Sequence, residues 1–501
     1  MTGLAALGLV MLIVMIGAIF IGFPISFTLL FLALSFGYFG LGEVVFSLAY
    51  FQTIGMMKEE LLAAVPLFIF MGFVTEQAGL MERLFSALRL LLAPIRGALF
   101  AVVILTASIF AMATGIVGAA VTVLGIMASP IMVKTGYDGK LAAGAITAGG
   151  TLGILIPPSV MLIVMGPVIG VSVADLYAAA FGPGFLLAGL YLVYLLGRAF
   201  INPSLGPPVP KEDRIHSAPV IVREVLIGVV PLACLIAAAL GSILAGLATP
   251  TEASGIGALG ALILAAAYRK LSWANLKRAV LSTTATSSMV LFLAVTSNIF
   301  GAVFARMGTA NWITESMLAL QFPPVIMLVV VLLLIFLLGW PFEWPAIILV
   351  FLPIFYPVMD ALKGDIGAAL GIPVEWVMVW FGALVAVTLQ TAFLSPPVAM
   401  SAYYLKQVVK EWSLATIYKG MFEFMVLQVI AIALVVAFPA IATKLPEELQ
   451  AVARAVKTEE VDDSANRLEE DPFKGAQEEG QAQEPEAEGD ELEKDELKAT
   501  K

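Results

Sequence analysis

Long apolar stretches separated by short polar segments dominate the pattern along the chain. The first 40 residues are almost continuously apolar and are divided at Pro24, and further apolar stretches follow as far as residue 442. Many of these stretches reach or exceed the roughly 20 residues that a helix needs to span a bilayer. The pattern therefore predicts an all-α polytopic membrane protein with about ten spanning helices. No basic segment and no cleavage motif precede the first stretch, so we expect it to be a retained helix rather than a signal peptide.

Two of the apolar stretches are too long for one span and contain a central break. The first covers residues 98–133 and breaks at Thr114 and Gly115, and the second covers 323–359 and breaks within the sequence GWPFEWP that begins at Gly339. Glycine and proline weaken or end a helix. We therefore expect two re-entrant helical hairpins, each of which enters and leaves the membrane on the same side.

Each predicted hairpin is followed by an apolar span that is itself broken in the middle. The first broken helix covers residues 141–168 and the second covers 374–405. Each break contains a threonine followed by two consecutive prolines, which remove helix hydrogen bonds. These residues are Thr151, Pro157 and Pro158 in the first broken helix and Thr391, Pro396 and Pro397 in the second.

The matching elements divide the chain into two repeats. Residues 1–200 form the first repeat, residues 224–443 form the second, and the proline-rich segment 201–223 links them in the cytoplasm. Lys and Arg in short loops favour the cytoplasmic side of a membrane. Most basic side chains reach that side when the two repeats have opposite orientations. The sequence therefore predicts two inverted-topology repeats, each with one hairpin and one broken helix.

The acidity of the chain comes from its C-terminal end. The net charge is -10, but residues 444–501 alone contain 8 Lys and Arg and 19 Asp and Glu. This segment is rich in Glu, Gln, Pro and Gly, so it cannot bury enough apolar surface to offset its ordering entropy. We expect an acidic, disordered tail after a short helix near residues 446–456.

The composition excludes several classes of function. The chain has one cysteine, Cys234 in an apolar run, and one histidine, His216 in a polar loop, so it forms no internal disulfide, haem site or zinc site. No Walker A motif occurs, because the pair Gly139 and Lys140 is followed by Leu141. Buried polar groups are sparse and neutral, which argues against an intramembrane enzyme. We expect no enzymatic activity, no cofactor beyond a coupling ion, and no nucleic acid partner.

The recurring breaks point to transport. Unpaired backbone groups in hydrocarbon cost several kcal/mol each, so breaks persist only where protein or a wet cavity shelters them. Broken helices in inverted repeats are typical of a transporter site near the membrane midplane, where unwound carbonyls hold a cation. A single proline or glycine is more often a kink or a packing contact, and the functional interpretation therefore depends on the recurrence in both halves.

The coupling ion can be judged from the oxygen atoms at the breaks. Neutral carbonyl and hydroxyl oxygens suit a small hard cation such as Na+, whereas proton coupling needs a titratable group. Among the carboxyls in apolar surroundings, only Glu343 lies at a predicted hairpin tip. Trp340 and Trp344 beside it are equally compatible with a structural role at the membrane interface. The other three carboxyls in apolar surroundings are Glu76, Asp175 and Glu252.

Three strings carry a family resemblance: GYDGKLAAGAITAGGTLGILIPPSVMLIVMG, ATPTEASGIGALGALI and GWPFEWPAIILVFLPIFYPVM. Over residues 1–443 the chain resembles the large membrane subunit of tripartite ATP-independent periplasmic (TRAP) transporters, nearest the branch labelled mannitol or chloroaromatic transport. The resemblance implies a multi-pass protein of the bacterial cytoplasmic (inner) membrane, surrounded by membrane lipid. It implies Na+-driven uptake of an organic anion such as a carboxylate, by an elevator motion of the hairpin domain.

The resemblance also implies partners and site residues. The partners are an extracytoplasmic substrate-binding protein and a small four-helix membrane subunit, and the alternative is a stand-alone Na+ or H+ coupled organic-anion symporter that needs no binding protein. The first hairpin tip, ATGIVGAAVT, lacks the serine-rich stretch of many relatives and offers fewer hydroxyl ligands. The implied cation ligands are Thr114, Gly115, Gly149, Gly150 and Thr151 at one site and Gly339, Glu343, Thr388, Thr391 and Ser395 at the other, and the implied substrate contacts are Gly118, Thr122, Pro157, Pro158, Pro396 and Pro397.

Overall fold

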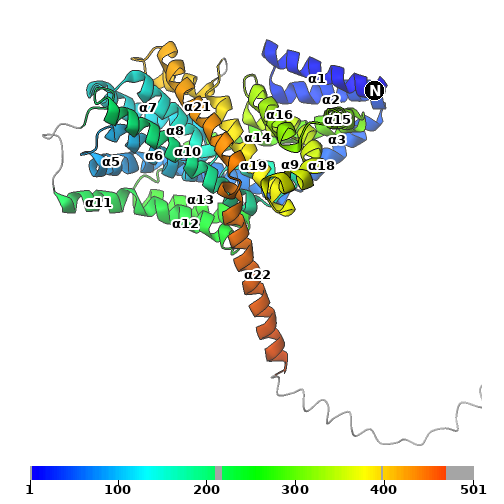
Figure 1. Ribbon diagram of the computed structural model, residues 1–501. Helices are drawn as coiled ribbons and strands as arrows, with labels where there is room; N and C mark the ends of the chain where they lie inside the picture. Colours follow the sequence, from blue (N-terminus) through cyan, green and yellow to red (C-terminus); the bar gives the residue numbers. More distant parts are fainter. Residues whose placement is uncertain (1–2, 209–216, 397–398, 470–501) are drawn as a thin grey trace, which may run out of the picture. The chain divides into compact units, whose positions relative to one another are not determined.

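The computed structural model describes residues 3–208, 217–396 and 399–469. All regular elements within these ranges are helices, as the hydrophobic pattern predicts (Figure 1). The first repeat contains α1 (Gly3–Ile21), α2 (Ile25–Leu41), α3 (Val44–Met57), η1 (Glu60–Ala63), α4 (Ala64–Gln77), α5 (Leu80–Leu92), α6 (Ala98–Thr114), α7 (Val117–Lys134), α8 (Gly139–Thr151), η2 (Leu152–Ile154), α9 (Val160–Ile169) and α10 (Val173–Ile201).

The second repeat follows the linker with the same order of elements. Its helices are α11 (Ala218–Gly228), α12 (Val230–Leu244), α13 (Pro250–Ala267), α14 (Trp273–Arg306), α15 (Thr309–Leu318), α16 (Pro324–Leu338), α17 (Trp344–Ala346), the π-helical segment η4 (Ile347–Phe351), α18 (Leu352–Leu370), α19 (Val374–Gln390), η5 (Thr391–Phe393), α20 (Met400–Val408) and α21 (Leu414–Ala437). The C-terminal helix α22 (Ala440–Glu469) comes last.

The predicted breaks are present as helix ends. Helices α6 and α7 form the first hairpin and meet at Gly115 and Ile116, and α16 pairs with α17–α18 across residues 339–343. The broken helices are α8–η2–α9, interrupted between Ile154 and Val160, and α19–η5–α20, in which the described helices end at Phe393 and resume at Met400. The second hairpin extends beyond its predicted end at residue 359, because polar residues there continue the helix α18 to Leu370.

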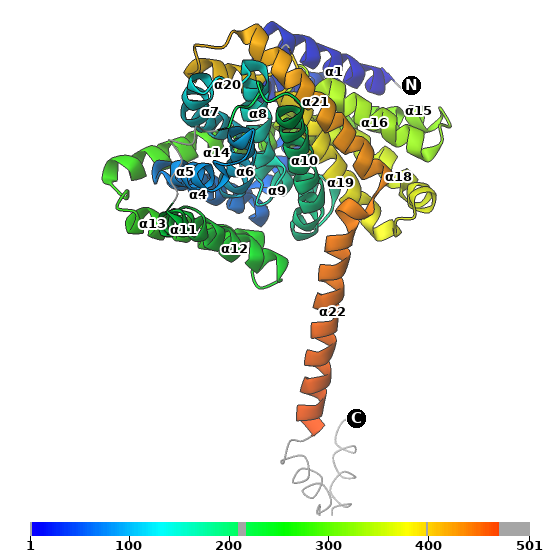
Figure 2. The same ribbon diagram turned by 60° about the vertical axis from the view of Figure 1, so that its left-hand side comes forward.

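The last long helix of each repeat packs on the broken helix of the other repeat. Helix α21 contacts α8, and α10 contacts α19, so the two hairpin regions form one connected group of helices (Figure 2). The α8–α21 crossing is close, because a Cβ atom on Gly420 would lie 3.0 Å from the backbone N of Gly144 and would collide with the carbonyl oxygen of Lys140. In the α10–α19 contact, a Cβ atom on Gly382 would lie 2.6 Å from Leu176 Cδ2.

A charged cluster accompanies the α8–α21 crossing. The carboxylate of Glu423 lies 3.8 Å from Lys140 Nζ and 3.7 Å from Arg198 Nη1, and it accepts a hydrogen bond of 2.5 Å from the hydroxyl of Tyr194. Lys140 and Glu423 retain side-chain exposures of 44% and 25%. Solvent therefore screens the pair, which contributes about 1 kcal/mol or less.

We expect a double-mutant cycle of Lys140→Gln and Glu423→Gln to give a coupling free energy of about 0.2–1 kcal/mol in thermal unfolding. Screening by water sets this small value. The Lys406→Gln and Glu315→Gln pair serves as a control, since neither side chain has an ion pair with the other among the described contacts. A coupling free energy well above about 2 kcal/mol would show that solvent does not screen the Lys140–Glu423 pair.

A second group of helices consists of the first half of each repeat. Helix α4 packs on α13 and α14, and α2 packs on α14. The short helices α5 and α15 link this group to the hairpins, because α5 contacts α6 and α15 contacts α18. Both short helices begin after a glycine with positive φ, Gly79 at 70° and Gly308 at 77°.

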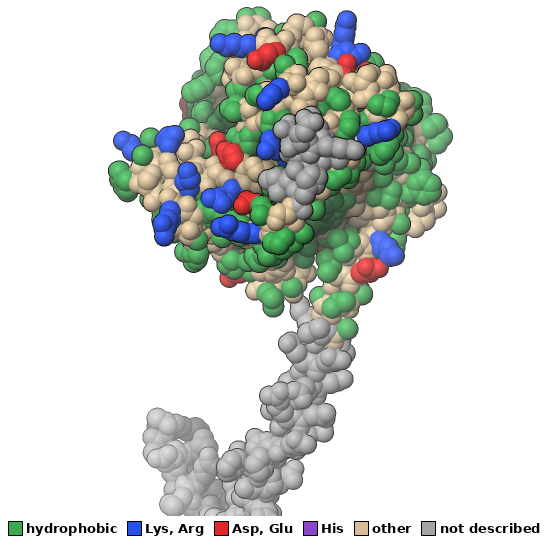
Figure 3. Space-filling model, turned by 90° about the vertical axis from the view of Figure 1, so that its left-hand side faces the viewer, with side chains coloured by type: hydrophobic (Ala, Val, Ile, Leu, Met, Phe, Trp, Pro, Cys, Tyr) green, Lys and Arg blue, Asp and Glu red, His purple; other side chains and the backbone are tan. Residues whose placement is uncertain are grey.

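The surface of the helical region is largely apolar. Many large hydrophobic side chains are exposed, such as Phe27 at 64%, Phe39 at 81% and Val193 at 73%. Figure 3 shows one face, where hydrophobic side chains surround scattered Lys and Arg and fewer Asp and Glu. In the described residues, ten helical segments are long and apolar enough to span a bilayer. The apolar surface is therefore the lipid-facing surface of a multi-pass membrane protein.

The chain consists of two compact units, residues 1–447 and 448–501. Helix α22 begins in the first unit and continues in the second as far as Glu469. The predicted short helix near residues 446–456 is thus too short, because Ala, Glu, Lys and Arg continue to favour helix beyond it. The remainder of the predicted acidic tail, residues 470–501, lies outside the described residues.

Candidate functional site

A central cavity of about 220 Å³ lies where the two hairpin tips and the two helix breaks meet. The second group of helices contributes Ile69 of α4 and residues of α14 to its lining. The lining is mainly apolar, with few polar groups, as small-molecule sites usually are. The lining residues are Ile69, Gly115, Ile116, Val117, Gly118, Ile154, Val160, Thr286, Met289, Val290, Glu343, Trp344, Pro345, Phe393, Met400 and Tyr404.

The first hairpin tip is placed by a left-handed glycine. Gly115 has φ +60°, a conformation that costs other residues energy. A Cβ atom at Gly115 would lie 3.8 Å from the carbonyl oxygens of Gly153 and Pro158. The tip therefore reaches the break of the first broken helix, and the chain then starts α7 at Val117 beside the cavity.

The paired glycines Gly149 and Gly150 let the first broken helix pass between the two hairpin arms. A Cβ atom on Gly149 would lie 3.1 Å from Ala107 Cβ of α6, and one on Gly150 would lie 3.1 Å from the backbone N of Val121 in α7. The next residue, Thr151, is fully buried and donates its hydroxyl proton to the Ala148 carbonyl at 2.8 Å. Its oxygen lone pairs remain acceptors.

The second hairpin tip is longer and carries a carboxyl group. A Cβ atom on Gly339 would lie 3.0 Å from Ala392 Cβ, so this tip also reaches the break of its neighbouring broken helix. Glu343 precedes α17, and Trp344 and Pro345 bring that helix start to the cavity wall. The π-helical segment η4 follows at once; such segments often occur at functional sites.

Three buried hydroxyls gather around the second helix break. Thr388 donates to the Leu384 carbonyl at 2.8 Å, Thr391 to the Thr388 carbonyl at 2.6 Å, and Ser395 to the Thr391 carbonyl at 2.7 Å. Each proton is used within the helix, which leaves the hydroxyl oxygens available as acceptors. The three oxygens suit a hard cation in kind and in neutrality.

Sequence reasoning missed Gln390, which lies among these hydroxyls in the chain. Its side chain is fully buried, and both amide atoms are without a hydrogen-bond partner in the described structure. An unsatisfied buried amide is costly and occurs chiefly at functional positions or beside bound water. An apolar run with one glutamine carries no periodic signal, so only burial identified the residue.

The structure divides the predicted site residues into two sets. Gly115, Gly118 and Glu343 line the central cavity, whereas the predicted glycines and hydroxyls of the helix breaks are buried and do not line it. Of the other predicted substrate contacts, Thr122 is half-buried on α7, Pro157 and Pro158 are buried without lining the cavity, and Pro396 is exposed. The side chain of Thr114 and the residue Pro397 lie outside the described residues.

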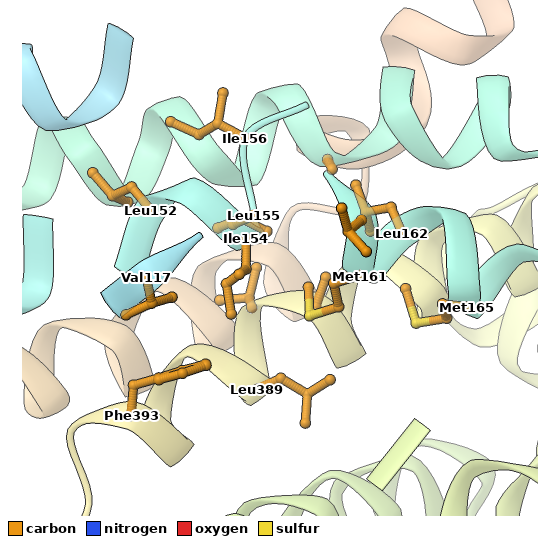
Figure 4. Close-up of a cluster of buried hydrophobic side chains, with 14 of the residues drawn as sticks. Val117, Leu152, Ile154, Leu155, Ile156, Met161, Leu162, Met165, Leu389 and Phe393 are labelled. Atoms are coloured by element: carbon orange, nitrogen blue, oxygen red, sulfur yellow. The ribbon is translucent and has the colours of Figure 1, made fainter. Parts of the chain in front are cut away.

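Apolar side chains from both repeats hold the breaks in place. Figure 4 shows Ile154, Leu155 and Met161 from the first broken helix near Leu389 and Phe393 from the second. All five are buried, with Phe393 the most exposed at 9%. The two breaks thus share one core.

Comparison with known proteins agrees with this arrangement. The family described as "Tripartite ATP-independent periplasmic transporter, DctM component" matches residues 10–441. The sialic acid TRAP transporter large permease protein SiaM of Vibrio cholerae is 28% identical over 435 residues, which cover 86% of this chain and 96% of that protein. The C4-dicarboxylate TRAP transporter large permease protein DctM of Pseudomonas aeruginosa is 29% identical, over 77% of this chain and 86% of that protein.

A solved structure supports the fold. The YdaH transporter of Alcanivorax borkumensis aligns with a TM-score of 0.56 at 17% identity, over 81% of this chain and 90% of that chain. The matched family covers both hairpins, both broken helices and both walls of the cavity. The chain therefore belongs to the family of the DctM component, the large membrane permease of tripartite ATP-independent periplasmic transporters.

Proposed function

We propose that the chain couples a Na+ gradient to the uptake of an organic anion that a substrate-binding protein delivers. The observation that carries the proposal is the central cavity, in which both hairpin tips, both helix breaks and the helices α4 and α14 meet. The relatives named above are permeases for sialic acid and for C4-dicarboxylates, and both substrates contain carboxylate groups. A small organic carboxylate is therefore the substrate class that we assign to this cavity.

Sodium coupling is supported by the neutral oxygen atoms at the hairpin tips and helix breaks. Gly149, Gly150 and Thr151 lie at the first break beside Gly115 of the first hairpin tip, and three hydroxyls lie at the second break beside Gly339 of the second tip. Carbonyl and hydroxyl oxygens are the ligands that hard cations prefer. These neutral groups have no proton to exchange at ordinary pH, which favours Na+ over H+ as the coupling ion. The hydroxyls at the second break are those of Thr388, Thr391 and Ser395.

An elevator motion is supported by the two groups of helices. Contacts between the two repeats, of α8 with α21 and of α10 with α19, join the hairpins and broken helices into one group. The cavity lies between this group and the helices α4 and α14. A site at such a boundary can change its access when one group moves as a body against the other.

The proposal requires two partners, a small membrane subunit and a substrate-binding protein. The experiment is gentle solubilisation of the tagged chain from its host, identification of proteins that copurify in stoichiometric amounts, and reconstitution with a Na+ gradient. We expect a small membrane subunit to copurify and uptake to require the binding protein. Uptake of free substrate by the chain alone would instead identify a stand-alone symporter.

Replacement of Thr391 or Thr151 by valine should weaken Na+ activation of uptake about tenfold each. Loss of one charge-assisted oxygen contact costs about 1–3 kcal/mol, and 1.4 kcal/mol corresponds to a factor of ten. The measurement is the Na+ concentration for half-maximal uptake by the reconstituted complex. Thr284→Val, at an exposed position on α14, is the control. An unchanged Na+ response in both variants would remove these hydroxyls from the cation sites.

A further inference from the structure

The central cavity carries one acidic group and no basic one among its described lining residues. Glu343 is half-buried at the second hairpin tip, and the remaining lining is apolar apart from the hydroxyls of Thr286 and Tyr404, the indole N–H of Trp344 and the backbone of the first tip. No ion pair or hydrogen bond of the Glu343 carboxyl appears among the contacts of the described residues. The charge of this cavity is therefore that of Glu343.

Glu343 also faces a second cavity, of about 580 Å³. That cavity lies between the turn that joins α1 to α2, the middle of α14, and the second hairpin tip. Its described lining again contains no Lys or Arg, and it shares Met289, Val290 and Pro345 with the central cavity. Glu343 therefore lies at the boundary of two neighbouring cavities.

A carboxylate without a basic partner restricts the charge of what can bind beside it. Like charges in a site of low dielectric repel strongly, and no described side chain here offsets the repulsion. A second carboxylate on the substrate would add to this cost. A hydroxyl or amino group on the substrate, by contrast, would donate a hydrogen bond to Glu343, and bonds to a charged acceptor are strong.

We propose that Glu343 determines substrate specificity by accepting a hydrogen bond from a hydroxyl or amino group of a monocarboxylate and by excluding dicarboxylates. This inference rests on the proposed function for the carboxylate class of the substrate. The apolar remainder of the wall, with Trp344, Phe393 and Met289, packs against the body of the molecule. The substrate class therefore differs from the C4-dicarboxylates for which the Pseudomonas relative is named.

The charge of the cavity is measured first, by thiol modification in the solubilised complex. The single native cysteine, Cys234, is exposed and is replaced by serine, and Thr286→Cys then places one thiol in the cavity wall. Without Na+, a cationic trimethylammonium methanethiosulfonate should react roughly tenfold faster than its anionic sulfonate analogue, after correction for their rates with free thiol. Glu343→Gln should remove this difference, whereas Glu315→Gln, at an exposed position on α15, should preserve it.

Selectivity is measured next, as protection of the same thiol by two acids. In the chain with Glu343, glycerate, a hydroxy monocarboxylate, should protect better than the dianion succinate. Glu343→Gln should shift the ratio towards succinate by roughly tenfold. Because the thiol is probed without transport, failure of Na+-driven uptake would leave these results unaffected and would count against the proposed function alone.

Three outcomes would overturn the inference. Equal reaction of the cationic and anionic reagents would show that Glu343 does not set the charge of the cavity. Equal protection of the thiol by glycerate and succinate, both with Glu343 and with Glu343→Gln, would show that Glu343 does not select the substrate. The third outcome is that Na+ abolishes the difference in reaction rate between the two reagents and that Glu343→Gln no longer binds Na+. This result would assign the Glu343 carboxyl to a cation site and would leave the proposal of sodium coupling intact.

Discussion

Uptake should fall about 10- to 100-fold when Gly118 is replaced by leucine, while the complex remains folded. Gly118 lies in the first turn of α7 and lines the central cavity. A Cβ atom there would already lie 3.0 Å from the Tyr404 ring, so a leucine side chain must either enter the cavity or displace Tyr404. Overfilling a packed site costs about 1–3 kcal/mol, which corresponds to about that loss of affinity.

The measurement for Gly118→Leu is uptake by the reconstituted complex, with the thermal unfolding midpoint recorded in parallel. Gly189→Leu is the matched control, because a Cβ atom at Gly189 on α10 meets no other atom within 4 Å. We expect the control to retain both uptake and unfolding midpoint. Near-normal uptake by Gly118→Leu would show that the substrate does not use this part of the cavity.

Gly420→Ala should destabilise the protein by about 1–3 kcal/mol. The new Cβ would collide with the Lys140 carbonyl and lie 3.0 Å from the Gly144 backbone N. Backbone atoms of a helix cannot rotate away as the end of a side chain can. Helices α8 and α21 would have to separate, and the contact between the two repeats would loosen.

Thermal unfolding of the purified complex tests Gly420→Ala, with Gly197→Ala as its matched control. A Cβ atom at Gly197 meets nothing within 4 Å, so alanine there should be neutral or slightly stabilising through its higher helix propensity. Equal midpoints for the two variants would falsify the close α8–α21 crossing. A loss of uptake in Gly420→Ala at temperatures well below unfolding would indicate that the crossing also transmits movement between the repeats.

The breaks were predictable from sequence because lipid leaves the backbone few choices. Within hydrocarbon every backbone group must be paired, so glycine and double proline in an apolar run indicate a helix end sheltered by protein. The helix ends at Gly115 and near Glu343, and the break at Pro157 and Pro158, lie where that argument places them. The continuation of α18 to Leu370 and the length of α22 were not predictable in this way, because polar helices outside the lipid carry no hydropathy signal.

The walls of the central cavity could not be predicted. Ile69 lines it and is buried, whereas Ile263 is exposed on the lipid-facing surface, and nothing in the local sequence separates the two. An apolar side chain has the same hydropathy whether it meets lipid, core or substrate. Gln390 was missed for a related reason, since its burial without a partner is a property of the packed structure.

The sequence by itself determined the membrane class, the order of elements in the two repeats, the hairpin tips and the broken helices. These features follow from local rules, namely the length of apolar runs and the effect of Gly and Pro on a helix. Only the tertiary structure decided which of the predicted residues meet. In the structure Gly118 and Glu343 line one cavity, whereas the threonine hydroxyls are buried and do not line it. These positions depend on contacts between helices distant in the chain, which local rules do not specify.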